Sequence, residues 1–584
     1  MSTRLFAPLG ALLLFFFSCN NPETPATNSA TTDSAFAGVN DRQWWKEAIV
    51  YQIYPRSFQD SDGDGIGDLK GIISRLDYLQ SLGITAIWLN PIYASPNDDN
   101  GYDISDYRAI MKDFGTMEDF DALLKGLHDR KIKLIMDLVV NHSSDEHEWF
   151  RQSRQSRTSP YRDYYHWWNA ERGKPNFRYS LFDVNHDAWK YDSATNAYYL
   201  HYFSRKQPDL NWENPKLRRE VYDIMKFWAA KGIDGFRLDA FQFVAKDTTF
   251  PPFPQGFEKN FIRYYAMVPP IHSYLKEMNE EVFRKYPLMS VAEGAGNSFE
   301  DAHDLVDADR HELNMAYAFD GVDLGNHNGY SLARFKEIYS RWDSAFAENG
   351  WLSIFLANHD QARMVSRFGN DAPPFRDLSA KMLTTFMLTM RGTPYCYNGD
   401  ELAMTNIGFD RIEDYQDVPT LNEYQHQKNI GGDLKAFLEK IKHSCRDNGR
   451  TPFQWDDSPQ AGFTTGTPWL KVNPNYSSLN AASQEKDSLS VLHYFRRLVA
   501  LRKATPLLVY GRYSLVDKDN PRVYAYTREL NGKRWLIALN FTAEAAPFQP
   551  GTDLAAARLL VSNYPGGGAA TTLRPYEARI FALP

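Results

Sequence analysis

The stretch TMEDFDALLKGLHDRKIKLIMDLVVNH, residues 116–142, contains one complete repeat of the pattern on which the fold depends. Its first part, Thr116–Lys131, has the pattern of a helix, and Thr116 followed by Asp119 is a capping signal at its start. Its second part, Lys133–Val140, is the continuous apolar run typical of a buried parallel strand. A helix followed directly by such a strand is the repeating unit of an α/β fold.

The same alternation continues on both sides of this stretch. Helical segments such as Gly71–Leu82 and Lys216–Lys231 separate the predicted strands. Eight strands with intervening helices predict a closed (β/α)8 TIM barrel over residues 44–505. The predicted strands are Ala48–Tyr54, Thr85–Leu89, Lys133–Val140, Gly235–Leu238, Leu288–Ala292, Glu312–Ala316, Trp351–Ala357 and Pro394–Tyr397.

Two regions depart from the barrel pattern. Residues 143–214 are polar and aromatic with few apolar periods, and they predict an insertion domain after the third strand. After a predicted helix at Ser488–Lys503 the chain changes to short strands that partly alternate at period two. These strands, Tyr510–Val516, Val523–Arg528, Arg534–Asn540 and Ala578–Leu583, predict an antiparallel β-sandwich domain over residues 506–584.

Composition limits the classes of function. The chain has 584 residues, a formal net charge of −8 and 15% aromatic residues, which argues against global disorder and against a basic surface for nucleic acid. Its three cysteines, Cys19, Cys396 and Cys445, exclude a disulfide scaffold. We expect Cys396 and Cys445 to be free thiols, because pairing would require the fold to bring them close. We expect the protein to be a monomer.

The N-terminus has the features of an export signal, in which Arg4 is followed by the apolar run Leu5–Phe17 and then by Ser18 and Cys19. The position of Cys19 resembles that of the lipidated cysteine of lipoproteins, so residues 1–19 are predicted to be a lipoprotein-type signal. An ordinary secretory signal is the alternative. Residues 20–43 are rich in small and polar residues and predict a flexible tether. We therefore expect an exported, periplasm-facing lipoprotein that reaches the membrane only through this lipid anchor.

Polar clusters follow four of the predicted barrel strands. They are Asp137–His142, Arg237-Leu-Asp239, Glu293 and Asn358-His359-Asp360. In a TIM barrel the carboxyl ends of the strands meet on one face, where active sites are built. A single carboxylate after a strand is usually a helix cap or a solvated loop residue. Asp239, Glu293 and Asp360 all occupy equivalent positions, and this repetition favours a catalytic group of three carboxyls.

These clusters, together with residues 83–91, 207–211 and 392–401, resemble in order the motifs of the α-amylase family, glycoside hydrolase family 13. The run Ser95–Ser105 and the motif Gln207–Asn211 are similar to its oligo-1,6-glucosidase and α-glucosidase branch. The resemblance implies a retaining, exo-acting α-glucosidase that acts on short α-glucans of the maltose or isomaltose type. Asp239 would be the nucleophile, Glu293 the general acid/base, and Asp360 the group that stabilises the transition state.

The electrostatics of these carboxyls can be anticipated in part. Arg237 lies two residues before Asp239 on the same strand face, so its charge is expected to keep Asp239 ionised. Glu293 lies between Ala292 and Gly294 with little charge nearby, which would let it hold a proton.

The resemblance also implies a set of substrate-binding residues. Tyr102 would stack on the sugar ring, His142 and His359 would donate to sugar hydroxyls, and Phe182 and Phe203 would form part of the pocket wall. Gln207 is expected to line the same pocket. Asp99 and Arg450 match a pair that closes the far end of the pocket and makes the enzyme exo-acting. Ala240, a small residue after the nucleophile, favours α-1,4 over α-1,6 linkages in this branch.

The loop after the first strand, Asp60-Ser-Asp-Gly-Asp-Gly-Ile-Gly-Asp68, has carboxylates at even spacings. Hard cations such as Ca²⁺ prefer oxygen ligands of this kind. The family resemblance implies a structural Ca²⁺ or Mg²⁺ held by the carboxylates of Asp60, Asp62, Asp64 and Asp68 and by the carbonyl of Ile66. An Asp- and Gly-rich turn without metal is the alternative.

Two other functions remain open at this point. The same three carboxyls would serve a transglycosylase or isomerase, such as a trehalose synthase or a sucrose isomerase. A protein of another class, a non-catalytic glycan-binding lipoprotein, is disfavoured because a binder needs no acid/base carboxyl.

Overall fold

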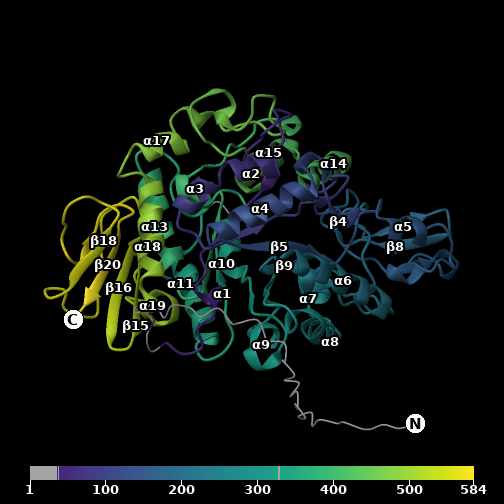
Figure 1. Ribbon diagram of the computed structural model, residues 1–584, viewed down its shortest axis with the longest axis horizontal. Coiled ribbons are helices and arrows are strands. Elements are labelled where there is room, and N and C mark those ends of the chain that lie inside the picture. Colours follow the sequence, from purple (N-terminus) through teal and green to yellow (C-terminus); the bar gives the residue numbers. More distant parts are fainter. Residues whose placement is uncertain (1–35, 37–38, 327–328) are drawn as a thin grey trace, which may run out of the picture.

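A computed structural model describes residues 36, 39–326 and 329–584, and it contains the predicted parallel barrel (Figure 1). Its eight strands form one sheet in the order β11-β10-β9-β5-β2-β1-β13-β12. A parallel bridge between Ala316 and Leu352 joins the two ends of this sheet, so the sheet closes into a barrel. The strands are β1 (Val50–Ile53), β2 (Ala86–Leu89), β5 (Lys133–Val139), β9 (Gly235–Asp239), β10 (Met289–Ala292), β11 (Met315–Ala316), β12 (Ser353–Ile354) and β13 (Thr393–Tyr397).

Each barrel strand is buried on both faces, which explains the continuous apolar runs in the sequence. Val50, Trp88, Ile135 and Val291 belong to one cluster inside the barrel, whereas the alternate residues pack in a second cluster beneath the helices. The helix α4 (Met117–Asp129) begins with the predicted cap, because the Thr116 side chain accepts from the Asp119 backbone and the Asp119 carboxylate accepts from the Thr116 backbone.

Several predicted elements have different bounds in the structure. Strands predicted at Glu312–Ala316 and Trp351–Ala357 are reduced to the two-residue strands β11 and β12. The segment Gly71–Leu82 forms two short helices, α2 (Leu69–Ser74) and α3 (Leu76–Ser81). The chain turns between them at Arg75, whose guanidinium donates to the Gln59 side chain and lies over the Trp455 ring.

The predicted insertion after β5 contains its own small antiparallel sheet, with β8 (Ala197–Leu200) between β6 (Trp167–Asn169) and β7 (Trp189–Asp192). An isolated bridge between His142 and Asp209 connects the end of this segment to the end of β5. The insertion therefore returns to the face of the barrel where the active site is expected. After β13, the helices α14 (Val418–Asn429) and α15 (Leu434–Ser444) lie next to each other at the top of the view in Figure 1.

The C-terminal part is an antiparallel sheet of five strands in the order β14-β15-β16-β20-β18, as predicted, with a two-stranded sheet of β17 and β19 packed across it. The prediction placed Tyr510 in a strand, but it ends the helix α19 (Pro506–Tyr510), and the prediction missed β18 (Arg558–Ser562). The other strands are β14 (Arg512–Val516), β15 (Val523–Leu530), β16 (Lys533–Asn540), β17 (Ala546–Pro547), β19 (Thr572–Leu573) and β20 (Ala578–Leu583). The helix α18 (Val491–Lys503) precedes them.

Cys396 and Cys445 are both buried free thiols, as predicted. The predicted signal and Cys19 lie outside the described residues. Within residues 36, 39–326 and 329–584, no helix combines the length and the apolar character that crossing a membrane requires.

Candidate active site

The buried guanidinium of Arg237 contacts one carboxylate from each of three neighbouring strands, β5, β9 and β10. They are Asp137, Asp239 and Glu293. Arg237 Nη1 lies 2.5 Å from Asp239 Oδ1 and 2.7 Å from Asp137 Oδ1, and its Nη2 lies 2.6 Å from Glu293 Oε1. Strand register explains this arrangement, because Asp137 pairs with Arg237 and Leu238 pairs with Ala292, the residue before Glu293. The candidate nucleophile and the candidate acid/base therefore meet at neighbouring nitrogens of one side chain.

Two electrostatic predictions need correction here. Glu293 was expected to have little charge nearby, but it forms an ion pair with Arg237. Arg237 was expected to keep Asp239 ionised, but it divides its charge among three carboxylates. Burial raises the pKa of Asp239 well above its usual value, Glu293 and Asp137 add to the rise, and Arg237 opposes it.

The backbone of Ala240 positions Glu293. Ala240 has a positive φ of 44° and directs its N–H to Glu293 Oε2 at 2.7 Å. A non-glycine residue in this conformation is uncommon and points to a local constraint. The turn after the candidate nucleophile thus fixes the carboxyl that would protonate the leaving group.

Asp360 lies in a positively charged part of the site. Its Oδ1 is 2.9 Å from Arg446 Nη1 and 2.9 Å from Arg450 Nη2, and its Oδ2 is 3.2 Å from His359 Nε2. Burial alone would raise the pKa of Asp360, but these three partners together hold it below its usual range. Asp360 therefore stays ionised over the working pH range of a protein.

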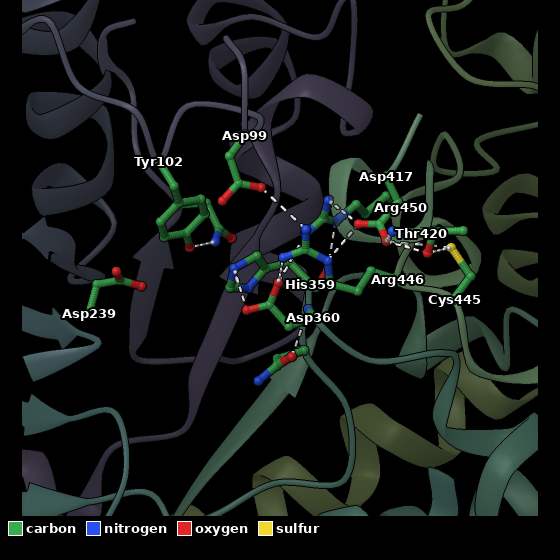
Figure 2. A network of polar contacts seen from close by, with 12 residues as sticks. Asp99, Tyr102, Asp239, His359, Asp360, Asp417, Thr420, Cys445, Arg446 and Arg450 are labelled. Atoms are coloured by element: carbon green, nitrogen blue, oxygen red, sulfur yellow. Dashed lines mark hydrogen bonds and ion pairs between the residues drawn. The ribbon is translucent and has the colours of Figure 1, made fainter. Parts of the chain in front are cut away.

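Asp99 was expected to pair with Arg450, but in the structure the partner of Asp99 is Arg446. Arg446 Nη2 lies 3.2 Å from Asp99 Oδ1, while Arg450 bonds to Asp360 and to the backbone carbonyl of His359 (Figure 2). The two arginines are one helical turn apart around the short helix α16 (Asp447–Arg450), so sequence spacing alone could not decide between them. Sequence reasoning also missed Asp417, which accepts from Arg446 Nε at 2.6 Å and so orients it.

Tyr102 and His359 form a stacked pair beside the carboxyls, with ring centroids 5.2 Å apart and planes 5° apart. The Tyr102 hydroxyl donates to Asp137 Oδ2 at 3.0 Å. The amide nitrogen of Gln52 donates a hydrogen bond to His359 Nδ1 at 2.8 Å. Because Nδ1 accepts, the proton of the His359 ring is on Nε2, which faces Asp360. The Tyr102 ring is thus available for a sugar only at its free face and edge.

His142 and Gln207 are fully buried beside Asp99. The Gln207 amide donates to Asp99 Oδ2 at 3.1 Å, and His142 Nε2 lies 3.0 Å from the backbone carbonyl of Tyr102. Burial lowers the pKa of His142 to about 3, so its ring is neutral. A sugar hydroxyl would share the Nε2–H of His142 with the Tyr102 carbonyl.

These side chains enclose one pocket. Its lining brings together most of the predicted site and adds Arg446, which the sequence analysis did not identify. The lining residues are Asp99, Tyr102, His142, Phe182, Phe203, Asp239, Ala240, Glu293, Asp360 and Arg446. Arg237, Gln207, His359 and Arg450 lie behind this surface and hold it in place.

The loop after β1 brings together three of the predicted metal ligands. Carboxylate oxygens of Asp60, Asp62 and Asp68 lie within 4.8 Å of one another. Asp60 accepts from the backbone amides of Gly63 and Gly65, and the Thr464 hydroxyl also bonds to it. Asp64 instead accepts from the Ile66 backbone at 2.8 Å. An all-oxygen set of this kind suits a hard cation.

Comparison with known proteins gives a consistent result. The family model described as "Alpha amylase, catalytic domain" matches residues 52–511. The chain is 49% identical to a protein named oligo-1,6-glucosidase from Parageobacillus thermoglucosidasius, across 93% of this chain and 99% of that protein. It is 45% identical to a protein named alpha-glucosidase from Pediococcus pentosaceus, with 93% of this chain and 99% of that protein covered. The trehalulose synthase MutB from Pseudomonas mesoacidophila MX-45 has a similar structure, with 45% identity, a TM-score of 0.89, and 93% of this chain and 99% of that chain covered.

Proposed function

Because this chain belongs to the α-amylase family of glycoside hydrolases, we infer that it is a retaining, exo-acting α-glucosidase that releases terminal glucose from short α-glucans. The observation that carries this inference is the placement of Asp239 and Glu293 on one guanidinium at the end of the barrel. A retaining mechanism needs two carboxyls about 5–5.5 Å apart, one as nucleophile and one as acid/base.

In the first step Asp239 would attack the anomeric carbon while Glu293 gives its proton to the leaving oxygen. Glu293 is held for this task by the Ala240 amide and by Arg237. In the second step Glu293 would remove a proton from water, which then attacks the glycosyl ester. The ionised Asp360 would stabilise the positive charge that develops on the sugar ring in both steps.

Exo action is supported by an ion pair in the lining of the pocket. The carboxylate of Asp99 and the guanidinium of Arg446 face each other there at 3.2 Å, and both line the pocket. A charged pair of this kind can accept from and donate to the hydroxyls of a terminal sugar. It leaves little room for a longer chain to continue in that direction.

Hydrolysis has one specific competitor. The trehalulose synthase named above and an isomaltulose synthase from Klebsiella sp. LX3 share the fold at a TM-score of 0.89 each, with 45% and 43% identity. A sucrose isomerase would use the same three carboxyls and would differ in what attacks the glycosyl-enzyme. The relatives named for glucosidase activity reach 49% identity, and on this basis we favour hydrolysis.

One incubation series tests these alternatives. The purified protein is incubated separately with maltose, isomaltose, sucrose and trehalose, and free glucose and new disaccharides are measured. Glucose from maltose or isomaltose supports the proposal, and a rearranged disaccharide from sucrose supports the isomerase. No turnover of any of the four sugars would refute both.

We also propose that the loop after β1 binds a structural Ca²⁺ or Mg²⁺ through Asp60, Asp62 and Asp68. The support is the oxygen cluster itself, in which three carboxylates converge although like charges repel. The cation would neutralise this charge and stabilise the loop. No step of the glycosidase reaction passes through it.

We propose that the protein is exported and that a lipid attached at Cys19 holds it on the membrane surface as a monomer. The basis for the export and the lipid is the sequence of residues 1–19. Cell fractionation with mass measurement of the mature N-terminus tests this. An unmodified N-terminus, or a mature chain that begins after residue 19, would refute lipidation.

A further inference from the structure

We propose that helix α14 positions the substrate pocket, with Asn422 and His426 as positioning residues that set how tightly the terminal sugar is bound. The inference rests on the proposed α-glucosidase function and adds residues outside the pocket to it. We call the set of Asn422, Glu423 and His426 with the segment 182–186 the α14 clamp.

The first support is the pattern of contacts between α14 and the insertion. The Asn422 amide donates to the Phe182 carbonyl at 2.7 Å, and His426 Nδ1 lies 3.0 Å from the Val184 carbonyl. Glu423 Oε2 is 2.9 Å from His186 Nε2, and the rings of His186 and His426 stack with centroids 4.2 Å apart. One face of the helix thus holds every second residue of the segment 182–186.

The second support is that this segment forms a wall of the pocket. Phe182 lines the pocket and packs against Phe203, with ring centroids 5.2 Å apart. The guanidinium of Arg446, which reaches Asp99 at the closed end, lies 5.2 Å from the Phe182 ring centroid. A shift of Phe182 would therefore disturb the group that contacts the terminal sugar.

The same helix also holds Arg446 directly. Asp417, the N-cap of α14, accepts from the backbone of Thr420 and from Arg446 Nε at 2.6 Å (Figure 2). The N-cap of the helix and its second turn therefore hold the two sides of the same pocket wall. A change in the position of α14 would displace Phe182 and Arg446 together.

A purely structural role for α14 fits the composition of the helix poorly. Of its residues Val418–Asn429, Thr420 is the one that is buried, and the apolar packing of α14 consists mainly of partly buried Leu421 and Tyr424 on the side of α15. Binding energy at an active site depends on groups held close to the productive geometry by their supporting residues. Polar contacts to a pocket wall fit this positioning role.

The test compares Asn422→Ala and His426→Ala, singly and together, with Lys428→Ala as the matched control on the exposed face of the same helix. Glucose dissociation constants are measured by tryptophan fluorescence, and KM and kcat are measured with maltose. Each single variant should weaken glucose binding and raise KM by about three- to tenfold, since one hydrogen bond is lost, and kcat should change less. His426→Asn, whose amide nitrogen can reach the place of Nδ1, should restore most of the loss.

Hydrogen exchange gives a readout that needs no turnover. Peptides covering 182–186 should exchange faster in the double variant than in wild type or Lys428→Ala, because the carbonyl acceptors of this segment lose their donors. Unchanged glucose affinity with a loosened segment, or equal effects of Lys428→Ala, would overturn the clamp. A wild-type protein that binds glucose but cleaves neither maltose nor isomaltose would instead refute the α-glucosidase proposal, and binding and exchange would still decide the role of α14.

Discussion

Arg446 Nη2 lies 3.2 Å from Asp99 Oδ1, and both side chains line the pocket. Arg446 also bonds to Asp360 and Asp417, so one guanidinium connects the proposed terminal-sugar site, the candidate catalytic carboxylate Asp360 and the N-cap of α14. Most of the following predictions depend on charges held in this way.

Replacing Arg446 by Ala should lower kcat/KM for maltose by about 30-fold or more, because it leaves Asp99 buried without its ion-pair partner and removes the nearer of the two arginines that contact Asp417. Arg446→Lys keeps the charge and should recover part of the loss but not the three-way geometry. Steady-state kinetics with both variants measure this. If Arg446→Ala leaves KM and kcat at wild-type values, the assignment of the closed end to Arg446 is wrong.

Replacing Glu293 by Gln should lower kcat for maltose by about 10²–10⁴-fold, the range for loss of a general acid. A glucosyl fluoride, whose leaving group needs no protonation, should still form the glycosyl-enzyme rapidly and show a burst of fluoride. Circular dichroism melting of the variant provides the folding control. Equal losses with both substrates would argue that Glu293 has another role.

Stability should respond in opposite directions to neutral replacement of Asp239 and Asp360. Burial raises the pKa of Asp239, so its charge destabilises the folded state at neutral pH, and Asp239→Asn should raise Tm there. The pKa of Asp360 is lowered, so its charge stabilises the fold above the unfolded-state pKa of about 3.9, and Asp360→Asn should lower Tm at pH 7. Both differences should shrink as the pH falls below about 4.

Calorimetric scans from pH 7 to pH 3 check these signs. A lowered Tm for both variants at pH 7 would contradict the charge assignment for Asp239.

Removal of divalent metal should lower Tm, because a ligand that binds only the folded state at about 100 times its Kd contributes about 2.7 kcal/mol. Chelation followed by Ca²⁺ or Mg²⁺ titration in a thermal melt measures the effect. Asp62→Asn should abolish the response, whereas Asp64→Asn should weaken it less, since Asp64 lies outside the three-carboxylate cluster. A melt that is the same with and without chelator would refute the metal site.

Replacing Ala240 by Val should shift preference from maltose towards isomaltose by about 10- to 200-fold in the ratio of kcat/KM values, the range for one or two methyl groups at a substrate contact. Ala240 has a φ of 44°, where a β-branched side chain is strained, so the variant should also melt at a lower temperature. Ala240→Ser provides a control of similar size. An unchanged linkage ratio in a folded Val variant would show that position 240 does not select the linkage.

The sequence by itself determined the barrel and the C-terminal sheet, and it indicated that Asp239, Glu293 and Asp360 follow barrel strands. It could do so because these depend on local patterns, namely helical and strand periods and polar residues placed directly after apolar runs. Boundaries were less well determined. β11 and β12 are two residues long, because pairing with neighbours sets where a strand ends.

Only the tertiary structure decided which charges meet. It assigned Asp99 to Arg446 rather than Arg450, gave Arg237 to three carboxylates, and brought α14 against residues 182–186. These contacts join segments up to 347 residues apart. Ion pairs and hydrogen bonds depend on ångström-scale distances between such segments, which side-chain type and spacing along the chain do not specify.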